Sequence, residues 1–242
     1  MPNWVFNHLT IKKEYLGKIV NSDGKVDFNV AVPMPQSVID MAEDSKIETD
    51  VYYYLSNRLR LSQDIMTMNK TLSEVLGIVP GDIIFRIRLI SVNVPKGADP
   101  RECYIKYLHE QTTNAVNSKQ KPDYERGKML VDNYTKYGAM TWYDWSNKYW
   151  GCKWNASNSF VPEKENENGE ITVEFDTPWC CPFTWLENLG NQKIPFYVEW
   201  IEEQGYHGEV CSDGENVVCR DLPDLTWDEE KEEYVEYKEE DE

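Results

Sequence analysis

The sequence predicts an α+β fold, in which an antiparallel sheet is interrupted by a mostly helical insertion. The last third of the chain contains short segments of alternating apolar and polar residues, which are typical of strands. Together with one short helical segment they give the order strand, strand, helix and strand, which fits half of a split β-α-β unit. The 242 residues are 40 % hydrophobic and 28 % charged, which allows a core and excludes collagen, a coiled coil and wholesale disorder.

The first 35 residues predict two extended segments separated by a short helix. Residues 4–11 alternate well enough for a strand, and residues 12–20 have the spacing of a short amphipathic helix. Residues 26–32 are apolar and are predicted to be extended. Pro33-Met34-Pro35 then ends this part, because the residue before a proline is disfavoured in the helical region.

The predicted helical insertion covers residues from about 36 to 139. Residues 83–92 favour a strand by propensity, although a helix stays open. Residues 93–101 predict a loop, because they hold two prolines and a glycine. The helices predicted in this block are 49–61, 71–76, 103–116 and 122–138.

Most of the tryptophans are concentrated in one stretch of the chain. Seven of the nine tryptophans lie between Trp142 and Trp200. Strands are predicted at 171–175 and 194–201, on either side of a helix at 182–189. Residues 205–210 turn and return, and 217–218 could close a last hairpin.

The net charge of −18 is spread unevenly. Residues 221–242 hold twelve acidic residues and two lysines, a net charge of −10, which leaves −8 for residues 1–220. We therefore predict a single domain at 1–220 and an acidic, flexible tail at 221–242. Alternatively, this tail is a polyanion that occupies a basic groove on a partner.

The six cysteines predict a reduced protein of the cytoplasm. The first residues lack the features of an export signal, no apolar run approaches the ~18 residues of a membrane span, and a core of this size needs no disulfides. Zinc is the alternative, because His207 and Cys211 could share an ion with Cys152 or Cys219. Buried thiols are favoured, so we predict no metal and no cofactor. The cysteines are Cys103, Cys152, Cys180, Cys181, Cys211 and Cys219.

Four dispersed motifs resemble one family. Two are short: Met1-Pro2-Asn3-Trp4 opens the first strand, and Pro33-Met34-Pro35 follows the second extended segment. Two are longer, Tyr-Trp-Gly-Cys-Lys-Trp-Asn-Ala at 149–156 and Phe-Asp-Thr-Pro-Trp-Cys-Cys-Pro at 175–182. With the segment 196–208, they resemble the YubB ferredoxin-like domain family, also called Api92-like proteins, which are common on phages, prophages and plasmids.

The resemblance covers about 1–35 and 140–210 and has departures. The family patterns are W-G-T-K-W-[DN]-A and F-x-T-A-W-S-P-P. Here Cys152 replaces the threonine, Pro178 replaces the alanine, and Cys180-Cys181 replaces Ser-Pro. The resemblance implies a ferredoxin-like fold and a mobile-element context, and it brings no established reaction with it.

The candidate ligand-binding residues lie in the two longer motifs. Trp150, Lys153 and Trp154 could form a cage, because aromatic faces stack on bases or hold cations. Asp176 and Trp179 complete the candidate set, although the simplest role of Asp176 is to accept backbone N–H groups in a turn. The alternative is that the tryptophans pack the sheet against its helices.

Catalytic residues are not predicted. The three histidines, His8, His109 and His207, are far apart in sequence and stand in no triad setting. The chain also lacks the glycine-rich phosphate-binding motifs.

We therefore expect a non-enzymatic binding protein of a phage or mobile element, acting in the cytoplasm of the host. Its expected partner is a host protein with a basic surface, and an acidic antagonist of a defence or nucleic-acid-handling protein is one form of this role.

Two alternatives stay open: an enzyme of unknown reaction, and a nucleotide- or RNA-binding module that uses Trp150 and Trp154. The net −8 of residues 1–220 disfavours direct nucleic-acid binding. The residues that could form a local positive face are Arg58, Arg60, Arg86, Arg88 and Arg101.

Overall fold

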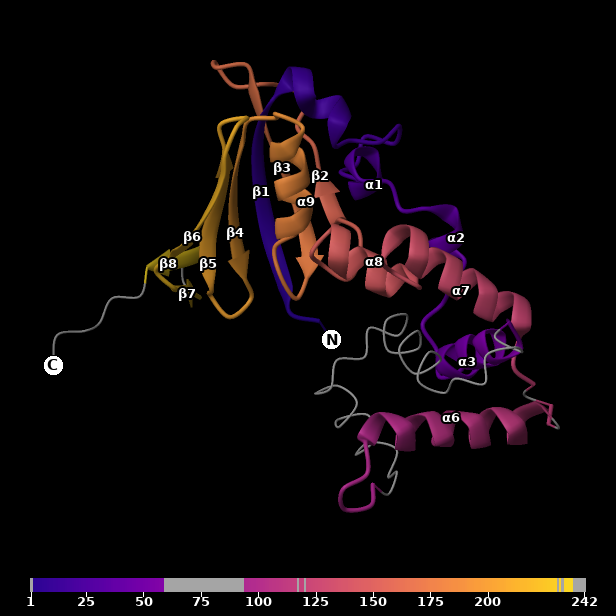
Figure 1. The fold of residues 1–242 in the computed structure, drawn as a ribbon. Coiled ribbons are helices and arrows are strands. Elements are labelled where there is room, and N and C mark those ends of the chain that lie inside the picture. The colour runs from indigo at the N-terminus through magenta and orange to yellow at the C-terminus, as the bar shows by residue number, and fades with distance from the viewer. Residues whose placement is uncertain are drawn as a thin grey trace, which may run out of the picture. The chain divides into compact units, whose positions relative to one another are not determined.

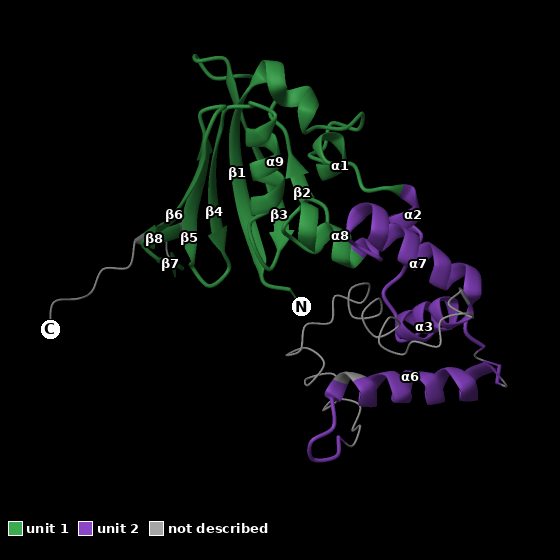
Figure 2. Ribbon diagram, in the orientation of Figure 1, with its two compact units in different colours: residues 1–35, 143–242 green, residues 36–142 purple. Residues whose placement is uncertain are grey.

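A computed structural model describes residues 2–58, 94–116, 118–119, 121–229, 231 and 233–236. Contacts divide the chain into two compact units, which Figure 2 shows in different colours. Unit 1 comprises residues 1–35 and 143–242, and unit 2 comprises residues 36–142. The predicted insertion at about 36–139 falls within unit 2.

Unit 1 is built on an antiparallel sheet in which the described strands have the order β2-β3-β1-β4-β5-β6. Helix α9 (Phe183–Asn191) connects β3 to β4 and lies over one face of the sheet (Figure 1). The order β2-β3-β1-β4, with β1 in the centre, is that of the ferredoxin-like split β-α-β arrangement, so the predicted α+β fold is confirmed. The strands are β1 (Trp4–Lys12), β2 (Ser157–Phe160), β3 (Glu170–Pro178), β4 (Phe196–Glu202), β5 (His207–Ser212) and β6 (Val217–Leu222).

Side chains of the central strand β1 alternate between the two faces of the sheet. Val5, Leu9 and Ile11 are buried, whereas His8 and Lys12 are exposed. The register, with Leu9 opposite Val173 of β3 and Val198 of β4, carries the same alternation across the sheet. One face therefore forms the core with the helices, and we call the other the open face.

Aromatic rings packed edge-on or tilted against one another lie in the core of unit 1. The ring of Phe28 lies 4.5 Å from that of Trp185 and 5.7 Å from those of Trp150 and Phe175. Phe28 belongs to α1 (Phe28–Ala31), so the prediction of an extended segment at 26–32 is wrong there. The Asp27 side chain accepts a hydrogen bond from the Asn29 N–H and caps a helical turn that an apolar run does not reveal.

Two further segments of unit 1 differ from the predictions. The helix predicted at 12–20 is a 3-10 helix, η1 (Lys13–Lys18). Part of the predicted flexible tail is ordered as a hairpin of β7 (Leu225–Asp228) and β8 (Glu233–Glu236). A cross-strand aromatic pair stabilises this hairpin, because the rings of Trp227 and Tyr234 lie 5.1 Å apart. Residues 237–242 lie outside the described residues.

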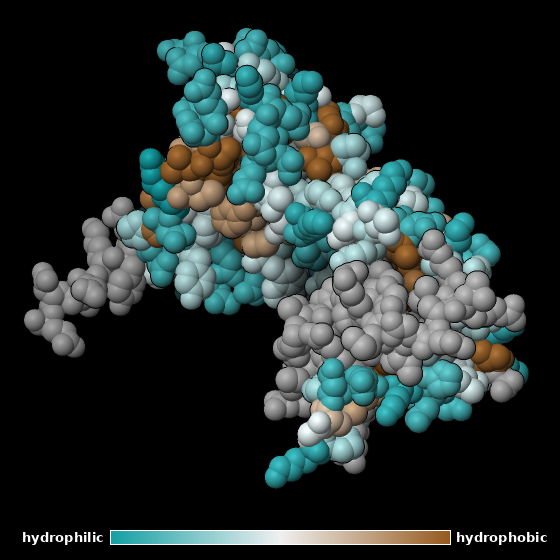
Figure 3. All heavy atoms as spheres, in the orientation of Figure 1, coloured by the Kyte–Doolittle hydropathy of each residue, from teal (hydrophilic) through white to brown (hydrophobic). Residues whose placement is uncertain are grey.

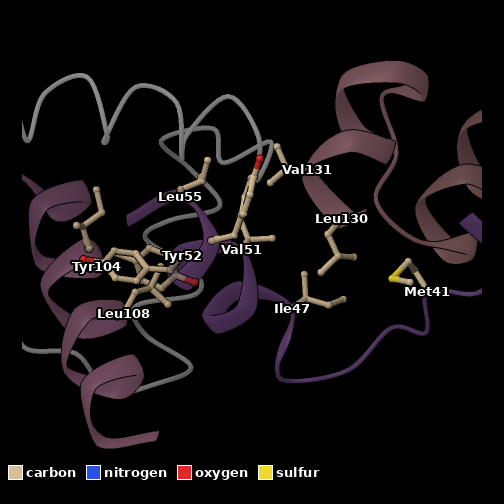
Figure 4. Packing of buried hydrophobic residues seen from close by; sticks show 11 residues of the cluster. Met41, Ile47, Val51, Tyr52, Leu55, Tyr104, Leu108, Leu130 and Val131 are labelled. Carbon is tan, nitrogen blue, oxygen red and sulfur yellow. The ribbon is translucent and has the colours of Figure 1, made fainter. Parts of the chain in front are cut away.

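Unit 2 is helical in its described part. The Asp123 side chain caps α7 by accepting from the N–H groups of Glu125 and Arg126, and Gly138 ends it in the left-handed conformation. Val51 and Leu130 belong to its apolar core (Figure 4). The helices are α2 (Gln36–Ile39), α3 (Ile47–Arg58), α6 (Pro100–Val116) and α7 (Tyr124–Tyr137), while α8 (Trp142–Tyr149) extends into unit 1.

The predicted helices at 49–61, 103–116 and 122–138 overlap α3, α6 and α7, and residues 59–61 lie outside the described residues. The segments predicted at 71–76 and 83–92 lie outside the described residues. Among the helices that the structure describes, none has both the length and the apolar character needed to cross a membrane.

Candidate functional site

Three segments of unit 1 converge where β1 begins and β3 ends. Trp4 stands opposite Pro178 in the sheet, and the N–H of Trp179 donates to the carbonyl of Asn3 at 2.8 Å. The thiol of Cys180 donates to the carbonyl of Gly151 at 2.9 Å. These bonds bring the two longer sequence motifs to the same end of the sheet.

Aromatic side chains are exposed at this end. Trp154 is 39 % exposed, Tyr143 is 40 % exposed, and the ring of Trp154 lies 6.4 Å from that of Trp4. The Lys153 ammonium lies 4.8 Å from the ring centre of Trp154 and 5.8 Å from that of Tyr143, which is cation–π range. With Trp179, they form a set that we call the tryptophan rim: Trp4, Tyr143, Lys153, Trp154 and Trp179.

Trp179 is exposed and has an unusual backbone. Its φ is +74°, in the left-handed region that non-glycine residues seldom adopt, and its side chain is 55 % exposed. Its bond to Asn3, and the bond from the Thr177 hydroxyl to the Cys180 carbonyl at 2.8 Å, hold the turn. The fold thus keeps a large aromatic side chain at the surface in a conformation that costs free energy.

Trp150 is placed apart from the tryptophan rim. It is 4 % exposed, and its indole N–H donates to the carbonyl of Val32 at 3.0 Å. Its ring packs edge-on against Phe28 and Trp145. Trp150 therefore packs the core, and the structure does not bring it together with Lys153 and Trp154 around a ligand.

Asp176 lies on the open face of the sheet, opposite Phe6 of β1 and Ser157 of β2. Its carboxylate accepts a hydrogen bond from the Asn158 side-chain amide at 2.6 Å, in place of the predicted bonds from a backbone turn. Burial raises the pKa of Asp176, and the hydrogen bond from Asn158 opposes that shift. Its role in the structure is to hold the bulged edge strand β2.

The open face also carries two of the three histidines. His8 stands between Glu174 of β3 and Glu199 of β4, and Nε2 of His207 lies 2.9 Å from the Glu199 carboxylate. The two histidines are far apart in sequence, but the sheet places both on the open face. The alternation of residues 4–11 could have indicated the face on which His8 lies. This face therefore carries carboxylates next to two histidines.

The proposed sharing of a metal by His207 and Cys211 does not fit the structure. Both lie on β5, where residues four apart are separated by roughly 13 Å along the strand. Cys152 is buried in the core and donates to the Trp154 carbonyl. Within the described residues, no group of three or more His, Cys, Asp or Glu side chains could hold a metal ion.

An open hollow of about 450 Å³ lies beside β2 in unit 1. Its polar groups bond mainly to each other: the Asp27 carboxylate accepts from Asn155 at 2.8 Å, and Ser159 accepts from the Val26 N–H at 2.8 Å. Burial alone would raise the pKa of Asp27, but bonds from Asn155, Asn29 and Asn21 together hold it below its ordinary value. The polar groups that line the hollow therefore serve to hold the fold together.

One face of unit 1 carries both hydrophilic and hydrophobic side chains (Figure 3). Figure 3 shows hydrophobic atoms in patches between hydrophilic ones. The predicted positive face cannot be placed, because Arg60, Arg86 and Arg88 and the side chains of Arg58 and Arg101 lie outside the described residues.

The chain is similar to one solved structure at low sequence identity. No family model matches the chain, and no curated protein matches it. A solved structure, the crystal structure of protein api92 from Yersinia pseudotuberculosis, of the family model DUF1281, is 13 % identical. The alignment covers 92 % of this chain and 98 % of that chain, with a TM-score of 0.36.

Proposed function

We propose that the chain is a non-enzymatic protein-binding module and that the tryptophan rim is its contact surface. The observation that carries this proposal is Trp179, a large aromatic side chain kept 55 % exposed at a φ of +74°. Strained backbone conformations cluster at functional sites, and tryptophans dominate the binding energy of many interfaces. Trp154, Tyr143 and Trp4 supply the neighbouring aromatic area.

The charge favours a partner with a basic surface. The chain carries −18, of which −8 belongs to residues 1–220, so a basic partner would be attracted over a distance of several ångströms. We propose a host protein as this partner, in keeping with the resemblance to Api92-like proteins of phages and plasmids. Antagonism of a defence or nucleic-acid-handling protein in the host cytoplasm is the specific form of the proposal.

Nucleotide or RNA binding is the second candidate, and Trp154 favours it. Its indole is exposed beside the Lys153 ammonium, an arrangement that can stack on a base. Trp150 cannot take part because it is buried, and the nearby open face carries Glu174, Asp176 and Glu199. Protein binding therefore fits the described surface better.

Affinity capture from a host-cell lysate tests the proposal, with the chain compared with Trp179→Ala and Trp154→Ala. The matched control is Phe160→Ala, an exposed aromatic of β2 that does not belong to the rim. We expect one partner to be captured at low salt, lost with both rim variants and kept with the control. Equal capture by all variants would contradict the proposal. A nucleotide-induced thermal shift that Trp154→Ala abolishes would support the second candidate instead.

A further inference from the structure

The two edges of the six-stranded sheet are built differently (Figure 1). The edge strand β2 has four residues, its register with β3 shifts between Ser157 and Phe160, and Asn158 has a φ of +47°. Short, bulged edges resist pairing with another chain. The edge strand β6 has six residues in unbroken register with β5, and no described segment pairs with its other side.

Two hairpins show which backbone groups of β6 point outward. In antiparallel pairs, residues alternate between hydrogen-bonded and non-bonded positions. Between β4 and β5, the N–H of Glu202 donates to the carbonyl of Tyr206 at 2.7 Å, so the backbone groups of Tyr206 face β4. Because successive residues of a strand face opposite neighbours, the backbone groups of His207, Glu209 and Cys211 face β6. Between β5 and β6, the bond from the Asp213 N–H to the Asn216 carbonyl at 3.3 Å has the same phase.

The outward groups follow from that phase. Leu222, Arg220 and Val218 stand opposite the three β5 residues that bond toward β6, so their backbone groups face β5. The N–H and C=O groups of the alternate residues Val217, Cys219 and Asp221 therefore face away from the sheet. Three successive outward positions are enough to pair with a short extended strand.

The helix-covered side of this edge is acidic. Val217 packs against Gly190 of α9, so Val217, Cys219 and Asp221 share this side. Burial and the nearby Glu187 carboxylate raise the pKa of Cys219, as expected for a thiol beside a negative charge. Side chains of an added strand on this side would meet the carboxylates of Glu187 and Asp221.

The open side of the same edge is apolar around one neutralised cation. Val218 is exposed, Leu222 is half-buried, and Nη1 of Arg220 lies 2.6 Å from the Glu209 carboxylate. An added strand would therefore place apolar side chains against Val218 and Leu222. The two sides together specify a strand that alternates basic and apolar residues.

We propose that the β6 edge binds an extended segment of a partner by strand addition, and that this segment alternates lysine or arginine with apolar residues. The main-chain ladder provides the affinity, and the acidic and apolar sides provide the specificity. A second copy of the chain fits less well, because β6 offers no basic residue on its helix side and two chains of −18 repel each other. The proposal does not depend on the tryptophan rim.

Fluorescence anisotropy tests it with a labelled short peptide that alternates lysine and valine. Two control peptides replace lysine with glutamate or carry N-methyl groups on the backbone amides that would join the ladder. The chain is compared with Cys219→Pro, which removes an outward N–H, and with Cys219→Val, which keeps it. We expect the proline to weaken binding about tenfold, the valine to change it less than about twofold, and both control peptides to bind weakly.

Circular dichroism first shows whether Cys219→Pro is folded; if it is not, the N-methylated peptide tests the ladder with the unchanged chain. Equal binding of the lysine and glutamate peptides, or of the N-methylated peptide, would overturn the proposal, as would the absence of binding at low salt. A dimer in size-exclusion chromatography that Cys219→Pro dissociates would assign the edge to a second copy and also overturn it.

Discussion

Trp150 and Trp154 stand four residues apart in one motif and occupy opposite environments. Trp150 is 4 % exposed among Phe28, Trp145 and the Val32 carbonyl, whereas Trp154 is 39 % exposed beside Lys153. The chain turns between them at Gly151, with a φ of +79°. The same residue type thus stabilises the core in one case and forms a surface in the other, and the turn decides which.

Truncating the two tryptophans should give the largest contrast. Trp150→Ala removes a buried indole and its hydrogen bond, so we expect a loss of about 3–5 kcal/mol in the free energy of unfolding. Trp154→Ala removes an exposed indole and should change that free energy by about 0.5 kcal/mol. Urea denaturation followed by circular dichroism measures both, and equal losses would remove the distinction between core and rim.

Substitution of Gly151 tests whether the turn separates the two environments. A Cβ there would lie 2.9 Å from the Thr184 N atom in a conformation that favours glycine, so Gly151→Ala should cost about 1–3 kcal/mol. Gly169→Ala is the control, because its φ is +74° and nothing lies within 4 Å of an added Cβ. A Gly151 loss no larger than the Gly169 loss would show that close packing at Thr184 is unimportant.

Relief of the backbone strain at Trp179 should increase stability, whereas the substitutions above decrease it. Trp179→Gly and Trp179→Ala remove the same indole, but only glycine adopts a φ of +74° without cost. We expect the glycine variant to be more stable than the alanine variant by about 1 kcal/mol, and both to lose the captured partner. Identical thermal midpoints would mean that the backbone of this turn is not strained.

Acid stability should depend slightly on Asp27, which caps the turn that carries Phe28. Its pKa is lower in the folded chain, so the unfolded chain binds the proton more readily. This contribution is present at neutral pH and is lost as the pH falls below about 4, the ordinary value for aspartate, through the folded pKa. Asp27→Asn should flatten this loss in urea denaturation at several pH values.

Asp176→Asn is the matched control for that pH series. Burial raises the pKa of Asp176, so its ionised form is disfavoured in the folded chain and its contribution has the opposite sign. Its replacement should not flatten the loss of stability in acid. The same flattening in both variants would contradict the assigned directions of the two pKa shifts.

Alternating sequence patterns made the sheet predictable. Features that depend on local helix capping or on burial in three dimensions could not be predicted from such patterns. Strand periodicity is seen at residues 4–11, 171–175 and 194–201, which overlap β1, β3 and β4. The turn of α1 depends on one capping aspartate within an apolar run, which periodicity cannot detect.

The candidate site was predictable in part. The motifs pointed to Lys153, Trp154 and Trp179, but burial separates Trp150 from them only in three dimensions. Trp4 joins the rim through its contact with Trp154, which is 150 residues further along the chain. Tyr143 joins it through Lys153, across the loop that follows α8. No local sequence pattern shows either contact.

The β7–β8 hairpin has a practical consequence for experiments on the charge of this chain. The N–H of Leu225 donates to the Gly205 carbonyl at 2.8 Å, and the Tyr234 hydroxyl donates to the Glu203 carbonyl at 3.2 Å. Deletion of residues 221–242 would therefore also remove these two hydrogen bonds to the β4–β5 hairpin. An effect of that deletion could not be assigned to the lost charge alone, because the structure would change as well. Exchange of glutamate for glutamine is therefore the better way to neutralise this segment, because it leaves the hairpin in place.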